Sequence, residues 1–166
     1  VTAGKHGEAL AKLRSAIELY EKSWAELVDF TRLADTYAQA GVAAWNSGAS
    51  AGDTTHLLEA GCTLLPTLVL DTRKKGDGKR EGLRPLFESL QERLGKAAKA
   101  SVSVAGVPEG AEAYVDGVKL AGSPLQSEPL LPGTHYVQVR GAGWEPWTQS
   151  VKVKGDRKST RLNSSH

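Results

Sequence analysis

Residues 108–135 decide the fold, and they contain Pro108-Glu109-Gly110-Ala111, Tyr114-Val115-Asp116-Gly117 and Leu131-Pro132-Gly133-Thr134-His135. Asp-Gly is the favoured pair for a two-residue hairpin, because glycine adopts positive φ without a Cβ clash. Pro132-Gly133 signals a second reversal of the chain. Two tight turns so close together, each beside an extended segment, predict a small antiparallel β module.

Apolar and polar residues alternate on both sides of these turns. Four separate runs show the pattern, around residues 102–104, 111–115, 137–139 and 151–153, with valine or alanine at every second position. Successive side chains of a strand point to opposite faces, so each run predicts a strand with one buried face. A module of about 55 residues buries only about 60% of its unfolded surface and is marginally stable alone.

The region 101–154 resembles the PEGA-domain family. The resemblance is carried by residues 108–111, 114–117, 122–125, 131–135 and 143–147, with Ser123 where the family usually has Thr and Trp144 where it has Tyr or Phe. It implies a prealbumin-like β-sandwich of a kind found mostly in bacterial envelope, surface or sensor proteins, often beside helical repeats. It carries over no catalytic residue, because the family motif consists of turn and core positions.

The first half of the chain predicts helices. Apolar residues recur at helical spacing from Leu10 to Leu27 and again from Ala34 to Trp45, with no Gly or Pro between Glu8 and Ala40. One long helix, or two helices stacked after a bend near residues 29–31, would satisfy this stripe. We expect an antiparallel bundle or a tetratricopeptide-like stack, although no 34-residue repeat aligns.

Local signals mark the later helices. Residues 46–53 are rich in Gly, Ser and Ala and predict a loop, with Asp53 as the N-cap of the next helix. Pro66 should kink or split that helix, because proline removes a backbone donor. Pro85 suits the first turn of a last helix that ends near Lys99.

The expected organisation is α+β: a helical domain at 1–99, a PEGA-like β-sandwich at 100–154, and a disordered, non-native tail at 155–166. Residues 156–166 resemble a translated sequencing adapter. They hold three of the 21 basic residues and one of the 19 acidic residues, so the first 155 residues carry 18 of each. The net charge of +2 therefore gives no reason to expect nucleic-acid binding.

The chain contains no methionine and begins at Val1, so we expect a fragment of a longer protein, and a missing signal peptide says nothing of secretion. No window approaches the run of about 18 apolar residues that crosses a bilayer, so no transmembrane segment is expected.

Four aromatic residues of the β module are candidate binding residues. Tyr114, Tyr136, Trp144 and Trp147 could offer an aromatic face to a sugar ring or a peptidoglycan strand. The alternative is structural: the two Trp residues close the open end of a thin sandwich and the two Tyr residues lie at its rim.

A second candidate is the basic loop. Arg73, Lys74, Lys75, Lys79 and Arg80 place five basic groups within eight residues, which suits a polyanion such as a phosphate head group or lipopolysaccharide. The alternative is a solvated loop between helices.

The sequence offers no catalytic, metal or cofactor site. Cys62 is the single cysteine and lies in an apolar helical row, so we expect a buried, inert thiol. Neither a Ser-His-Asp arrangement nor a phosphate-binding loop can be assembled.

We therefore expect a non-catalytic bacterial scaffold in the periplasm or on the cell surface. Its helical part would bind protein, and its PEGA part would contact a protein or a cell-wall polymer. The alternative is an accessory sensor or substrate-docking region of a larger enzyme, such as a membrane kinase or peptidase.

Overall fold

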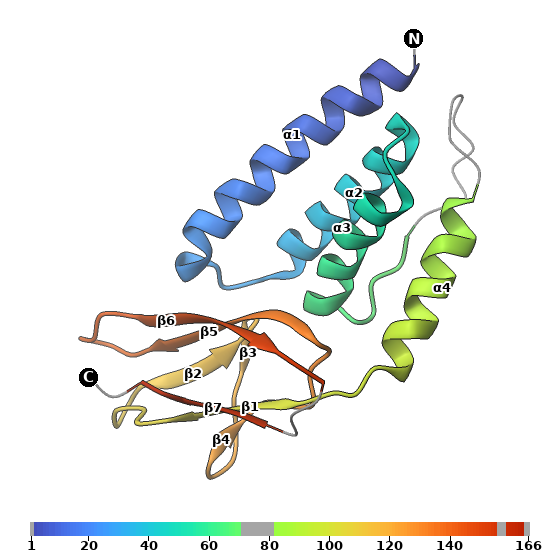
Figure 1. Cartoon of the computed structure of the whole chain (residues 1–166). Helices are drawn as coiled ribbons and strands as arrows, with labels where there is room; N and C mark the ends of the chain where they lie inside the picture. The colour runs from blue at the N-terminus through green and yellow to red at the C-terminus, as the bar shows by residue number, and fades with distance from the viewer. Residues whose placement is uncertain (1, 71–81, 156–158, 165–166) are drawn as a thin grey trace. The chain divides into compact units, whose positions relative to one another are not determined.

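The computed structural model describes residues 2–70, 82–155 and 159–164 (Figure 1). The chain forms two compact units. Unit 1 comprises Val1–Lys22 and Thr31–Lys96, and unit 2 comprises Ser23–Phe30 and Ala97–His166. Helices make up the first unit and β-strands the second, so the predicted α+β class is confirmed. The segment Ser23–Phe30, which we call the connector, belongs to unit 2 although it links two helices of unit 1.

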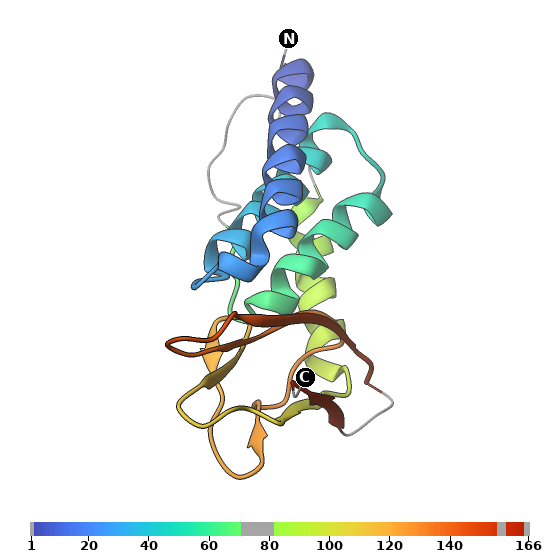
Figure 2. The same cartoon turned by 90° about the vertical axis from the view of Figure 1, so that its left-hand side faces the viewer.

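Unit 1 contains α1 (Thr2–Ser23), α2 (Thr31–Ser47), α3 (Ala51–Leu64) and α4 (Leu83–Lys96). Helices α2 and α3 lie side by side and run in opposite directions (Figures 1 and 2). Ile17 of α1 is buried with Ala40 and Ala44 of α2 and Leu57 of α3. The apolar stripe of the sequence thus becomes the packed face, while a tetratricopeptide-like arrangement stays a prediction.

The predicted bend is a full break. Helix α1 ends at Ser23, a short 3-10 helix, η1 (Trp24–Glu26), follows, and α2 begins at Thr31. Helix α3 ends at Leu64, two residues before Pro66, so the helix stops before this proline and is neither kinked nor split by it. Pro85 lies in the first turn of α4, as predicted.

The N-cap prediction for α3 is wrong. Ser50 is the N-cap, with extended backbone (φ −63°, ψ 155°), and its Oγ accepts a 3.0 Å hydrogen bond from Asp53 N. The same hydroxyl donates to Asp53 Oδ2 at 2.7 Å. Asp53 therefore lies inside the first turn, where an acidic side chain is favourable to the helix dipole. The predicted loop shortens because the small residues after Ser50 join the helix.

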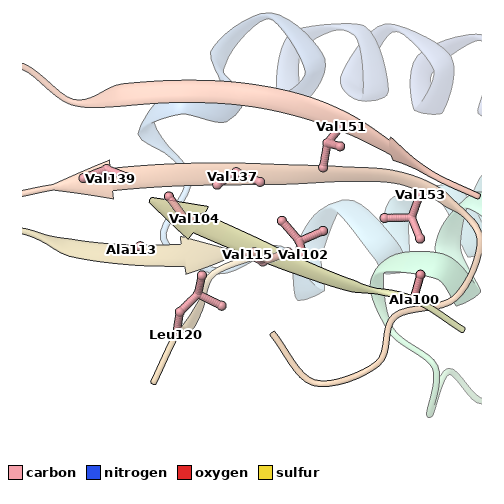
Figure 3. Packing of buried hydrophobic residues seen from close by; sticks show 10 residues of the cluster. All are labelled: Ala100, Val102, Val104, Ala113, Val115, Leu120, Val137, Val139, Val151 and Val153. Carbon is pink, nitrogen blue, oxygen red and sulfur yellow. The ribbon is translucent and has the colours of Figure 1, made fainter. Parts of the chain in front are cut away.

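Unit 2 contains two sheets. The strands are β1 (Ser101–Ala105), β2 (Glu112–Val115), β3 (Val118–Lys119), β4 (Leu125–Gln126), β5 (Gly133–Arg140), β6 (Trp147–Val153) and β7 (Ser159–Asn163). One sheet has the order β4-β1-β7 and the other β3-β2-β5-β6. The alternating apolar residues of β1, β2, β5 and β6 meet in one core (Figure 3), made of Val102, Val104, Ala113, Val115, Val137, Val139, Val151 and Val153 together with Ala100 and Leu120 from outside these strands.

The Asp-Gly hairpin is confirmed. Asp116 has φ +51° and Gly117 has φ +81°, the two positive values that a type I′ turn requires. The turn joins β2 to β3, with Val115 opposite Val118. Pro132 and Gly133 lead into β5, which pairs antiparallel with both β2 and β6.

The expectation of a disordered tail is wrong for residues 159–164. Strand β7 pairs in parallel with β1, with Val104 opposite Leu162. Leu162 packs against the core, and Ser164 donates from both its backbone N (2.9 Å) and its Oγ (3.1 Å) to Ala105 O. The physical reason is that β1 offers unpaired backbone groups along this edge, which any extended segment of suitable length can satisfy.

The alternation in β5 predicted one buried face, and this is also wrong. Val137 and Val139 face the core, yet Tyr136 and Gln138 on the opposite face are buried as well. The connector covers that outer face.

Candidate functional site

Two tight turns build the candidate site. In the first, Ala111 N donates to Pro108 O at 3.0 Å, and in the second Trp144 N donates to Gly141 O at 3.2 Å. Gly141 brings the turns together: a Cβ there would lie 3.0 Å from Ala111 Cβ and 3.2 Å from Trp144 Cδ1. The Pro-Glu-Gly-Ala turn and the turn before β6 therefore form neighbouring walls.

A cavity of about 300 Å³ opens at these turns. It is lined by Gly106, Pro108, Ala111, Val139, Arg140, Gly141, Trp144, Glu145, Trp147 and Ser164. Trp147 lies opposite Val139 in the sheet and packs its half-buried ring against the core. Trp144 is 57% exposed, so its indole is available to a ligand. The mostly apolar lining with a few polar groups, and a volume at the small end of the usual range, suit a small ring.

The structure separates the four predicted aromatic residues. Trp144 and Trp147 line the cavity together. Tyr114 lies on the outer face of β2, where its hydroxyl donates to Glu112 Oε2 at 2.5 Å and Arg140 Cζ lies 5.7 Å from its ring centroid. Tyr136 is only 7% exposed, because Trp24 and Phe30 pack on it. A single aromatic face made of all four residues therefore does not exist.

Sequence reasoning missed the other walls of the cavity. The sequence pattern at Pro108 and Ala111 predicts only a turn, and no motif points to Glu145. One signal in the sequence could have identified these residues. Each of the two turns borders the end of an apolar strand, and turns in that position lie together at the open end of a sandwich. The basic residues of the predicted polyanion site, Arg73, Lys74, Lys75, Lys79 and Arg80, lie outside the described residues.

The outer face of β2 and β3 carries a charged cluster. Lys119 and Tyr114 both donate to the carboxylate of Glu112. These hydrogen bonds, with that of Lys119 the stronger, hold the pKa of Glu112 below its usual value. The bond to Glu112 in turn raises the pKa of Lys119 and that of Tyr114. The cluster keeps this exposed face charged at neutral pH.

A buried pair ties the Asp-Gly hairpin to β5. His135 is fully buried, with Nδ1 2.5 Å from Asp116 Oδ2 and Nε2 2.8 Å from Leu131 O. A carboxylate and a carbonyl both accept hydrogen bonds, so this arrangement favours the doubly protonated, positively charged imidazole. Burial lowers the pKa of His135, but the hydrogen bond and the charge of Asp116, with the Leu131 carbonyl, outweigh it and leave the pKa raised.

Cys62 is buried in α3. Burial, with a smaller contribution from the charge of Glu59, raises the pKa of its thiol to about 11. The thiol is therefore protonated at neutral pH and is a poor nucleophile. Among the described residues, no three His, Cys, Asp or Glu side chains gather as metal ligands would.

Comparison with protein families identifies the fold of unit 2, because residues 99–165 match the PEGA domain family. The chain contains a PEGA domain, preceded by a helical region. The PEGA family is non-catalytic, and its members are typically extracellular or periplasmic binding modules. Comparison with curated proteins found no match. No helix within the described residues has both the length and the apolar character needed to cross a membrane.

Proposed function

We propose that this chain is a non-catalytic scaffold of the cell surface or periplasm and that its PEGA domain binds a cell-wall glycan. The proposal rests on the cavity beside Trp144. Its exposed indole gives a flat apolar surface for one face of a sugar ring, and Trp147 and Pro108 also line the cavity. The exposed carboxylate of Glu145 can accept hydrogen bonds from hydroxyl or amide groups of the sugar.

A glycan fits this cavity better than a protein partner does. A cavity of about 300 Å³ holds a ring-sized group and not the 20–30 residues that a stable protein interface needs on each side. The helical unit, in this proposal, supplies the protein contact of the scaffold. Val69 of unit 1 is 80% exposed and is available for such a contact.

Replacement of the exposed indole tests the proposal. We expect Trp144→Ala to weaken co-sedimentation of the full chain with purified peptidoglycan by about tenfold, because loss of a ring contact of this kind costs about 1–2 kcal/mol. Trp144→Phe should retain most of the binding, since a smaller ring still stacks.

Val118→Ala is the matched control, because Val118 is also a large exposed apolar residue but lies on β3, away from the cavity. It should bind as the unaltered chain does. Equal co-sedimentation of Trp144→Ala and the unaltered chain would contradict the proposed site.

A further inference from the structure

The connector Ser23–Phe30 occupies the outer face of β5. This face is formed by Tyr136, Gln138 and Arg140, which alternate with the core residues of the same strand. We call these three residues the β5 outer face. It is separate from the floor of the cavity, although Arg140 borders both.

The polar contacts go to the main chain of the connector. Gln138 Nε2 lies 2.9 Å from Trp24 O, 3.1 Å from Ala25 O and 3.1 Å from Leu27 O. Arg140 Nη2 also donates to Leu27 O. Trp24 O also accepts a 3.0 Å hydrogen bond from Leu27 N, which closes the single turn of η1, and Leu27 is the residue that follows this turn. The amide of Gln138 and the guanidinium of Arg140 thus bind main-chain carbonyls at and just after this turn.

Two aromatic side chains fix the ends of the connector. The ring of Tyr136 lies 5.0 Å from that of Trp24, tilted by 45°, and 5.3 Å from that of Phe30, stacked at 22°. Phe30 is 2% exposed. Gly117 of the hairpin allows the main chain of the connector to come close, since a Cβ on Gly117 would lie 2.5 Å from Val28 O.

Some side chains of the connector are exposed. Val28 is 71% exposed and Glu26 is exposed as well, whereas Ala25 and Leu27 are half-buried. The β5 outer face therefore contacts the connector in two ways. It binds the carbonyl groups of Trp24, Ala25 and Leu27, and it packs against the aromatic rings of Trp24 and Phe30, which are six residues apart. This division, with backbone contacts for affinity and two rings for specificity, is how peptide-binding domains recognise short segments.

We propose that the β5 outer face is a peptide-recognition site that is filled in cis by the connector and that accepts the same segment from a second copy of the chain. Its ligand class is a short peptide in a single helical turn, with aromatic residues at the positions of Trp24 and Phe30. Covalent attachment gives the cis segment a high effective concentration, so a segment supplied in trans binds only when the cis segment is weakened.

The test uses the full chain and a fluorescein-labelled peptide with the sequence of Ser23–Phe30. In the chain that carries Trp24→Ala and Phe30→Ala, we expect the peptide to bind with micromolar affinity by fluorescence anisotropy. Binding to the unaltered chain should be at least about a hundredfold weaker, because its site is filled. Adding Gln138→Leu to the double variant should weaken peptide binding at least tenfold, since the amide that contacts all three carbonyls is removed and Leu27 O keeps only Arg140 as a side-chain donor.

Two controls make the outcome decisive. A peptide with alanine at both aromatic positions should not bind, and Val118→Ala in the double variant should leave peptide binding unchanged. If the folded double variant does not bind the peptide, the proposal is overturned. If the double variant unfolds, Trp24→Ala alone takes its place. Unfolding of both would show that the connector is an inseparable part of the domain core, which also overturns the proposal.

Discussion

We expect His135 to make the stability of the PEGA domain depend on pH. Its charged form is held by Asp116, which also accepts a 2.9 Å hydrogen bond from Tyr136 N through Oδ1. One carboxylate therefore binds both the imidazolium and the backbone beside it. The pKa of His135 in the folded chain lies above its ordinary value of 6.5. A group whose pKa is raised by folding stabilises the fold below its unfolded pKa and loses this contribution as pH rises through the folded pKa.

We accordingly expect the free energy of unfolding of the PEGA domain to decrease as pH rises above about 6.5, by up to about 1.4 kcal/mol per pH unit, until the folded pKa is passed. Urea unfolding followed by tryptophan emission between pH 5.5 and 9 measures this. His135→Gln should remove the slope, and it should also destabilise the domain, because Asp116 then loses its charged partner.

His56→Gln is the matched control, since His56 lies on α3 in the helical unit. It should leave the slope unchanged. A slope that survives in His135→Gln would show that another group causes the pH dependence.

Among the elements, α2 and α3 depend on a glycine contact. A Cβ at Gly41 of α2 would lie 2.6 Å from Leu58 Cδ2 and 2.7 Å from Leu58 Cγ, and Leu58 is fully buried. The two helices therefore approach each other more closely than alanine would permit at this position.

Gly41→Ala should destabilise the helical unit by about 1–2 kcal/mol, because overpacking of a buried contact outweighs the gain of about 1 kcal/mol in helix propensity. Gly7→Ala in α1 is the matched control. No atom lies within 4 Å of a Cβ added there, so we expect it to stabilise the helix slightly. Thermal unfolding followed by the helical circular dichroism signal distinguishes the two, and a stabilising effect at Gly41 would contradict the contact.

Local patterns in the sequence predicted most of these elements. Alternating valines gave the strands of the core, Asp116 and Gly117 gave the hairpin, and Pro66 and Pro85 marked two helix ends. Each of these patterns determines the structure of residues close to it in the sequence. The burial of Gln138 could not be predicted in this way, because its partners are carbonyl groups more than a hundred residues earlier, and a carbonyl group has no signature in the sequence. The burial of Tyr136 has the same cause, because the rings that cover it, Trp24 and Phe30, come from a segment far earlier in the chain.

At the scale of the whole molecule, the PEGA domain is assembled from three stretches of chain: the connector, residues 97–155 and the last strand. The last stretch is the one whose sequence resembles an adapter translation. Its contribution to stability can be measured directly.

Removal of residues 156–166 should lower the unfolding temperature of the PEGA domain by about 4–8 °C, because the hydrogen bonds of β7, the packing of Leu162 and the bonds of Ser164 together contribute about 1 kcal/mol or more. Leu162→Ala should give part of this shift. Scanning calorimetry with tryptophan emission measures both, and an unchanged unfolding temperature after truncation would show that β7 adds nothing to the fold.

The place of the connector has a practical consequence for dissecting the protein. A recombinant fragment that begins at Ala97 would leave Tyr136 bare and Gln138 without the oxygens it binds. Such a fragment would expose an aromatic surface to solvent, and we expect it to self-associate during purification. Fusing residues 23–30 to its start through a flexible spacer restores the missing cover, so the boundary of this PEGA domain in space differs from its boundary along the sequence.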